Sequence, residues 1–164
     1  MKRGQLKLSF GMIFSIILIV IFIGTAFFAI NKFLDLQETV QVGKFATDFQ
    51  ADIKKIWDGS QGSEQREYTL PKKVQKVCLI DYPSEAKGKD SNLYKEFEQV
   101  FFETENMFFY PIGSAQGLDS RNMKYVDLEK ITETNNPFCI ENINGKVKPI
   151  IKKNFGEALV TIEK

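Results

Sequence analysis

The sequence predicts an α+β protein in which one long N-terminal helix, transmembrane and then amphipathic, packs on a small antiparallel β-sheet. Three observations support this class. Residues 10–30 carry no charge, residues 31–58 keep apolar side chains at helical spacing, and residues 66–164 alternate short apolar segments with turn residues. The remaining parts are a flank at residues 1–9 and a linker at residues 59–65.

The segment from Phe10 to Ile30 has the length and composition of a membrane-spanning helix. Fourteen of its residues are Phe, Ile, Leu or Val, and each favours insertion by roughly 0.3–0.6 kcal/mol near the bilayer centre. Since about 20 apolar residues cross the hydrocarbon core, the segment is long enough to span it. The hydroxyls of Ser15 and Thr25 can bond to carbonyl groups of the same helix.

The charges on either side of this segment predict its orientation. Lys2, Arg3 and Lys7 precede it, whereas Lys32 is closely followed by two acidic residues. Because positive charge resists translocation, we expect the flank at 1–9 in the cytoplasm and the β-rich domain outside the cell membrane. The lipid bilayer is then the first expected partner of the chain.

Two other interpretations of the apolar segment stay open. A secretory signal peptide could be cleaved near Gly24-Thr25-Ala26, although the apolar sequence continues to Ile30. A buried core helix is the second, but a small soluble domain could not cover a helix that is apolar on every side. The uninterrupted apolar run therefore favours a membrane anchor.

The helix is expected to continue beyond the bilayer as an amphipathic segment at residues 31–58. Its charged residues lie mainly on faces other than the apolar one. We expect the apolar stripe to dock on the sheet, and it comprises Phe33, Leu36, Val40, Val42, Phe45, Phe49, Ile53 and Ile56. Trp57 is expected to anchor the end of the helix, and the turn-rich residues 58–63 predict where it stops.

The domain at 66–164 predicts mainly strands and one further helix. The helix candidate is 92–105, and the strand candidates are 67–70, 74–81, 107–112, 138–143, 146–151 and 158–162. Asn144-Gly145 suits a type I′ turn and predicts a hairpin. Residues 124–131 fit a strand or a helix. Loops on a rigid sheet often carry recognition, so the expected contact sites are the loops 83–91 and 113–122.

The only two cysteines, Cys78 and Cys139, both fall within predicted strands. We expect a disulfide between them, because thiols outside the cell membrane can oxidise. The alternative is a pair of buried free thiols that pack as small apolar side chains. A disulfide would close a loop of about sixty residues and stabilise the fold by roughly 4 kcal/mol on chain-entropy grounds.

The N-terminal residues resemble a known family. Lys2-Arg3-Gly4-Gln5, followed by residues 6–10 and the apolar helix, resembles the class III signal peptide of archaeal type IV pilin-like proteins. The resemblance covers about the first thirty residues and the general plan of a helix followed by a sheet. It implies that a membrane peptidase cuts between Gly4 and Gln5 and leaves the helix in the mature protein. It also implies a β-rich head and assembly into surface filaments through the apolar helices.

Ser9 departs from the pattern of that family. Many such pilins carry a glutamate at the fifth residue after the cut, where it pairs with the N-terminus of a neighbouring subunit, and Ser9 occupies that position here. A minor subunit, or an anchor that never polymerises, therefore fits better than a major filament subunit. Other pilin-like subunits or a membrane complex are the expected protein partners.

The composition argues against an enzyme and against a nucleic-acid-binding protein. The chain has no histidine, so a Ser-His-Asp or Cys-His arrangement is impossible, and it has no glycine-rich phosphate loop. A formal net charge of +1, with lysines interspersed among acids, offers no basic stripe for nucleic acid. We expect no catalytic residue, cofactor or metal site. We interpret the carboxylates around the predicted helix as a solvated face, formed by Glu96, Glu98, Glu103 and Glu105. The aromatic residues that could form a binding surface are expected in the core and the strands, and they are Phe108, Phe109, Tyr82, Tyr110 and Tyr125.

The sequence therefore predicts a non-enzymatic, single-pass membrane-anchored protein with a pilin-like extracytoplasmic domain, as a minor filament or surface component. An extracytoplasmic ligand-binding or accessory subunit of a membrane complex is the alternative. It would use a close helix–helix face at Gly11, Ser15 and Gly24. A membrane-tethered hydrolase is the third hypothesis, and it would need a cleft in which two carboxyl groups face each other.

Overall fold

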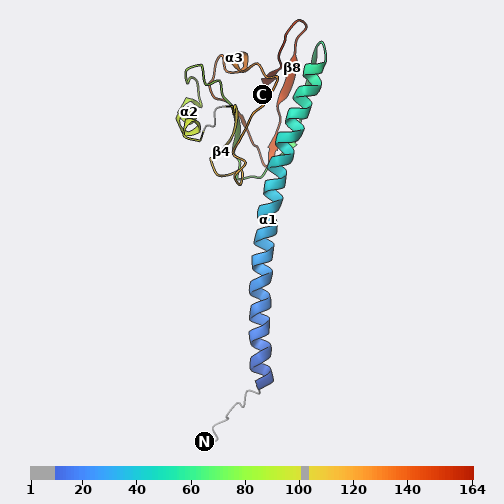
Figure 1. Ribbon diagram of the computed structural model, residues 1–164, viewed down its shortest axis with the longest axis vertical. Coiled ribbons are helices and arrows are strands. Elements are labelled where there is room, and N and C mark those ends of the chain that lie inside the picture. The colour runs from blue at the N-terminus through green and yellow to red at the C-terminus, as the bar shows by residue number, and fades with distance from the viewer. Residues whose placement is uncertain (1–9, 101–103) are drawn as a thin grey trace, which may run out of the picture. The chain divides into compact units, whose positions relative to one another are not determined.

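The computed structural model describes residues 10–100 and 104–164. The proposed cut between Gly4 and Gln5, the unusual Ser9 and the acidic Glu103 lie outside the described residues. The chain divides into two units, Met1–Gln37 and Glu38–Lys164, and the second is called the head below. Helix α1 (Phe10–Asp58), drawn in Figure 1, begins in the first unit and ends in the second.

The described part of the head contains three small β-sheets and two short helices (Figure 1). The first sheet has the order β1–β8–β9, formed by Gly62–Gln65, Ile150–Lys153 and Thr161–Glu163. The second pairs β2 (Tyr68–Thr69) with β7 (Lys146–Val147). The helices are α2 (Ser91–Glu98) and α3 (Leu128–Ile131).

The third sheet is the largest and has the order β5–β4–β3–β6. Its strands are β3 (Lys76–Leu79), β4 (Met107–Tyr110), β5 (Ser120–Arg121) and β6 (Phe138–Glu141). Every strand pair in the three sheets is antiparallel. The predicted fold class, a long helix on small antiparallel sheets, is therefore confirmed.

The four-stranded sheet is buried on both faces because its residues alternate between two cores. Val77 and Leu79 of β3 pack in the core that contains the C-terminal part of α1, whereas Cys78 packs in the core that contains α2. Phe109 and Phe108 of β4 divide in the same way. This arrangement explains why residues 77–80, in the second half of the strand predicted at 74–81, are apolar on both faces, as a central strand requires.

The linker predicted at 59–65 is partly wrong, because Gly62–Gln65 forms strand β1. Gly62 lies opposite Lys153 and Gln65 opposite Ile150 in an antiparallel pair with β8. Residues 62–65 read Gly-Ser-Glu-Gln and carry no apolar alternation. Their strand conformation therefore depends on a pairing partner that is remote in the sequence.

The hairpin predicted around Asn144-Gly145 forms its turn but not its long ladder. Asn144 and Gly145 have φ angles of 55° and 85°, as a type I′ turn requires, and a bridge joins Ile143 to Lys146. Beyond that bridge the chain separates, since β6 pairs with β3 and β7 pairs with β2. The turn therefore carries the chain from one sheet to another.

Three further segments differ in detail from the prediction. Helix α2 ends at Glu98 rather than Glu105. Asp90, the residue before its first turn, makes no capping hydrogen bond, and its carboxylate accepts a hydrogen bond from Lys76 Nζ at 2.6 Å. The loop predicted at 113–122 ends in strand β5. The ambiguous segment 124–131 forms a bridge and then helix α3, capped by the Asp127 carboxylate, which accepts a hydrogen bond from Lys130 N at 3.1 Å.

Candidate functional site

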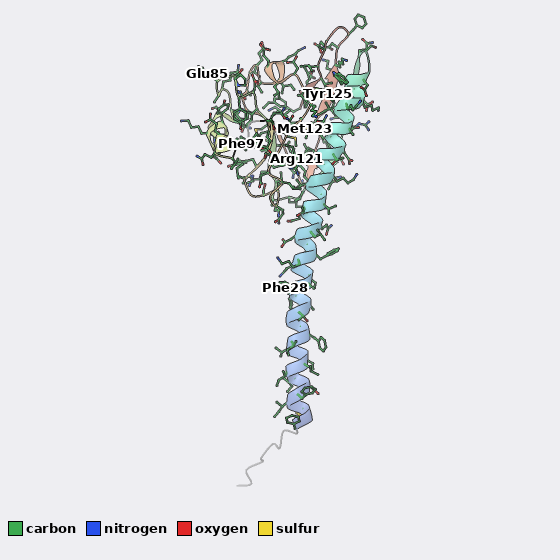
Figure 2. All side chains as sticks on the ribbon, viewed as in Figure 1. Phe28, Glu85, Phe97, Arg121, Met123 and Tyr125 are labelled. Carbon is green, nitrogen blue, oxygen red and sulfur yellow. A yellow bond between two sulfur atoms is a disulfide. The ribbon has the colours of Figure 1, made fainter. Side chains whose placement is uncertain are left out.

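The first part of α1 carries no charge at residues 10–30, and the helix is exposed on every side over residues 10–37. Among the described residues α1 is the one helix long and apolar enough to cross a membrane, judged by length and composition. Phe28, labelled in Figure 2, projects from this half of the helix. The Ser15 hydroxyl donates to Gly11 O at 2.8 Å and Thr25 to Ile21 O at 3.1 Å, so the helix satisfies both polar groups itself. These properties are consistent with a membrane anchor and contradict a buried core helix.

The apolar stripe predicted for residues 31–58 is only partly buried. Phe33, Leu36 and Val40 remain 66%, 60% and 59% exposed. The buried residues of α1 begin at Val42 and continue through Phe45, Ala46, Phe49, Ile53 and Ile56. At 3.6 residues per turn, Phe33, Leu36 and Val40 fall on a face of the helix away from this buried set. Val40 belongs to the head, and the prediction that it docks on the sheet is wrong because its side chain is exposed. Phe33, Leu36 and Val40 form a separate exposed surface, here called the outer stripe.

The buried part of α1 docks on the head through a cluster of aromatic rings. Phe45 stacks on Phe49 at 5.5 Å between ring centroids and meets Tyr68 edge to face at 5.3 Å. Phe45 also contacts Phe109 of β4 at 5.7 Å. The Tyr68 hydroxyl donates a 2.6 Å hydrogen bond to Asp52, and its burial is the main reason that the pKa of Tyr68 is raised. The helix and the sheet thus share one continuous core.

Trp57 attaches the C-terminal end of α1 to the head, as the sequence predicts. Its indole N–H donates to Ala158 O at 3.0 Å, and its ring stacks on Tyr125 with 4.1 Å between centroids. Figure 2 shows the labelled Tyr125 and Met123 beside this part of α1, and both side chains contact the core that the helix covers. Because both contacts hold the indole against the head, Trp57 serves to dock the helix, and its fluorescence can report that docking.

The disulfide predicted between Cys78 and Cys139 is present. The two residues lie directly opposite each other on the neighbouring strands β3 and β6, with 4.0 Å between Cα atoms. Their side chains are 0% and 2% exposed and pack in the core beside α2. The bond therefore links a central strand to an edge strand inside the head, away from solvent.

The start of the loop at 83–91, predicted as a contact site, is held in place by hydrogen bonds to the side chain of Asn136. This residue is fully buried, and its amide nitrogen donates to Asp81 O at 2.8 Å and to Ser84 O at 3.1 Å. Its amide oxygen accepts a 3.2 Å hydrogen bond from Asp81 N. Glu85, labelled in Figure 2, lies in this loop at the side of the head away from α1. The role of Asn136 could not be predicted from the sequence, because an Asn-Asn-Pro turn does not reveal that one amide will be buried.

We expect the substitution Asn136→Ala to lower the free energy of unfolding of the head by about 1–3 kcal/mol. The reason is that a buried backbone donor and several carbonyls of residues 81–85 would lose their partner. Denaturant unfolding followed by Trp57 fluorescence measures this loss. Asn135→Ala is the matched control, because the half-buried Asn135 accepts a single backbone hydrogen bond from Lys89 N, at 3.2 Å. Equal effects of the two variants would contradict the role given to Asn136.

The loop at 113–122 is held by the carboxylate of Asp119 and lies against α1 near Glu38, where the head begins. Asp119 accepts hydrogen bonds from the backbone N–H groups of Gly113 at 2.8 Å and Ala115 at 3.1 Å. Gln116 donates to Glu38 at 3.3 Å. A side-chain hydrogen bond from Lys73 is the main cause that lowers the pKa of Glu38. This loop therefore acts in packing on α1, which reduces the surface it offers to a partner.

The remaining candidate residues lie in structural positions. Glu96 and Glu98 are exposed on α2, as a solvated face would be. Phe108 and Phe109 are buried in the two cores, as expected for strand residues. Within residues 10–100 and 104–164, no group of three or more acidic or cysteine side chains could hold a metal ion.

A groove of about 660 Å³ runs along β6 on the head. Four lysines and two acidic residues contribute to its lining, together with backbone of β6 and the exposed side chain of Ile143. The lysines are Lys89, Lys146, Lys148 and Lys164, and the acids are Asp90 and Glu141. Neither the groove nor the gathering of its lysines could be anticipated, because these residues come from three separate parts of the chain, at residues 89–90, 139–148 and 164.

Comparisons of the chain with family models, curated proteins and solved structures found no match. We therefore identify candidate interaction surfaces from exposure, apolar character and charge, and two surfaces stand out. One is the exposed apolar half of α1 with the outer stripe, and the other is the groove along β6.

Proposed function

We propose that this chain is a non-enzymatic, single-pass membrane protein whose pilin-like head lies outside the cytoplasm, as a minor component of a filament or of the cell surface. The observation that carries the proposal is the continuity of α1. One helix of 49 residues has an apolar, exposed first part at residues 10–30 and a later part that docks on the sheets of a disulfide-bonded head. Lipid is the environment that removes such a surface from water.

Two independent features support the orientation. The flank preceding the helix carries Lys2, Arg3 and Lys7, which favour a cytoplasmic N-terminus. The head contains the buried Cys78–Cys139 disulfide, a bond that persists in oxidising compartments. Both support a head on the outer side of the membrane.

The outer stripe supports assembly through helices. Phe33, Leu36 and Val40 are large apolar residues at the positions i, i+3 and i+7, and α1 does not bury them against the head. A neighbouring helix that carries a similar stripe would remove them from water. In the resemblance to type IV pilin-like proteins, a cut between Gly4 and Gln5 would leave the apolar helix at the new N-terminus for this purpose. Ser9, in place of the usual glutamate, is the reason for proposing a minor rather than a major subunit.

The mass of the protein extracted from its native membrane tests the anchor and the processing together. The mass of a chain whose first residue is Gln5 is expected for the pilin-like protein. The mass of the chain from Met1 would indicate an unprocessed membrane anchor, and the mass of the chain from Phe27 would indicate a cleaved secretory signal and no anchor. The last result would overturn the proposal.

A photo-crosslinking residue at Val40 tests the assembly. A ladder of self-crosslinked species is expected if outer stripes pack together in a filament. A single crosslink to a different protein would instead favour the alternative, an accessory or ligand-binding subunit of a membrane complex. The same crosslinker at Lys72, an exposed position of the head, is the control for random encounter. If Val40 gives no more product than Lys72, the outer stripe is not an assembly surface.

A further inference from the structure

Strand β6 is an edge strand. In the order β5–β4–β3–β6 it pairs with β3 on one side, and no described strand pairs with its other side. An edge strand presents backbone N–H and C=O groups that can pair with another extended chain. Which of its groups face outward follows from the register.

The backbone groups of Cys139 and Glu141 point toward the open edge. Directly opposite residues of an antiparallel pair alternate between close, non-hydrogen-bonded pairs and wider, hydrogen-bonded pairs. Cys78 and Cys139 form a close pair, with 4.0 Å between Cα atoms, and Glu141 is two residues further along the strand. The next wide position agrees, since Asn142 N donates to Gln75 O at 2.7 Å. Cys139 and Glu141 therefore direct their N–H and C=O groups away from β3.

These outward groups line the groove of about 660 Å³ described above. One of them already has a partner, because Lys164 Nζ donates to Cys139 O at 3.1 Å. The ammonium group of Lys164 also lies 4.8 Å from the centroid of the Phe138 ring. A long, flexible lysine thus occupies a position that the N–H of an added strand would take, and a strand could displace it.

The charge of the groove selects the kind of strand. Lys146 and Lys148 both bond to the single carboxylate of Glu67, each at 2.9 Å, so one carboxylate balances two ammonium groups. The acidic Asp90 in the lining is neutralised by Lys76 at 2.6 Å. Lys89 pairs with the carboxylate of Glu141 at 3.4 Å. The excess positive charge of the groove therefore comes from the second ammonium group at Glu67 and from Lys164. Lysines at an edge discourage pairing with apolar or basic strands, but they attract a strand that carries carboxylates.

We propose that the open edge of β6 binds an extended, acidic segment of a partner protein as an added β-strand. The segment accepts a hydrogen bond from Glu141 N–H, donates one to Glu141 C=O and replaces Lys164 at Cys139 O. Its acidic side chains meet the lysines, and an apolar side chain rests on Ile143, which is 66% exposed. Main-chain pairing provides affinity and side chains on alternate positions provide selectivity, as in other complexes formed by strand addition. The site is independent of how the helix anchors or assembles.

A peptide-binding measurement on the full chain in detergent micelles tests the proposal. The probe is a fluorescein-labelled peptide of eight alternating Val and Glu residues, and fluorescence anisotropy reports its binding. We expect the Glu141→Pro variant to bind at least tenfold more weakly, because proline removes the outward N–H and puts its ring in the groove. Glu141→Gln is the matched control and should bind as well as or better than the unchanged chain, since it keeps the N–H and loses one negative charge. Lys148→Gln should weaken binding severalfold.

Two changes in the peptide separate strand pairing from charge and do not alter the protein. Methylation of alternate backbone nitrogens on the pairing edge should abolish binding, whereas methylation on the opposite edge should leave it intact. A peptide with Lys in place of Glu should not bind. The proposal is overturned if both methylated peptides bind alike, if the lysine peptide binds as well as the glutamate peptide, or if Glu141→Pro folds normally and binds unchanged.

Discussion

Replacing Cys78 and Cys139 together by alanine should lower the free energy of unfolding of the head by about 4 kcal/mol. The bond joins residues 61 positions apart in the sequence, and a cross-link over a loop of this length removes a large part of the entropy of the unfolded chain. A domain of this size is stabilised by only about 5–15 kcal/mol in total. The double variant should therefore unfold at much lower denaturant concentration.

Denaturant unfolding followed by Trp57 fluorescence measures this difference. Addition of a reductant provides the internal control, since it should destabilise the unchanged chain by a similar amount and leave the double variant as it was. Because both sulfur atoms are buried, the reductant should act mainly on the unfolded chain. An unchanged chain whose unfolding midpoint is insensitive to reductant would contradict the stabilising role of the disulfide.

The substitution Phe49→Ala should lower the free energy of unfolding of the head by about 3–5 kcal/mol. Phe49 is 1% exposed and lies between two other rings, 5.5 Å from the centroid of Phe45 and 5.6 Å from that of Tyr68. Its removal leaves a cavity where α1 meets the sheet, and the surrounding strands cannot collapse into it. The same denaturant measurement in detergent detects the loss, because Trp57 lies two helical turns further along α1.

Phe33→Ala is the matched control for Phe49→Ala, because both remove a phenylalanine ring from the same helix. Phe33 is 66% exposed and belongs to the outer stripe, so its loss should change the stability of the head by less than about 0.5 kcal/mol. If both variants destabilise the head equally, the boundary between the outer stripe and the docked face is misplaced. If neither does, the helix does not contribute to the core of the head.

The comparison of these two phenylalanines shows how far the periodicity of α1 could be interpreted from the sequence. The spacing of Phe33, Leu36 and Val40 and that of Val42, Phe45 and Phe49 both predict a helix, and the helix is present. Periodicity reports that a residue lies on an apolar face, but it does not report what covers that face. The position of the sheet decides this, and it covers the helix only from Val42 onward.

The candidate sites show the same division. The disulfide could be predicted because two cysteines in strands of a domain expected outside the cell membrane have few other roles, and its register then follows from the pairing of β3 with β6. The groove could not be predicted, since its lysines are ordinary surface residues in the sequence. They become a site only because β6 is an edge strand whose open side faces them.

The features that could be predicted from the amino-acid sequence depend on neighbouring residues: the apolar helix at 10–30, its continuation to Asp58 and the turn at Asn144-Gly145. These features follow from local composition and backbone preference, which each segment carries with it. The pairing of β1 with β8, the burial of Asn136 and the open edge of β6 became evident from the fold. Each of these depends on segments that are far apart along the chain, so no local pattern can encode it.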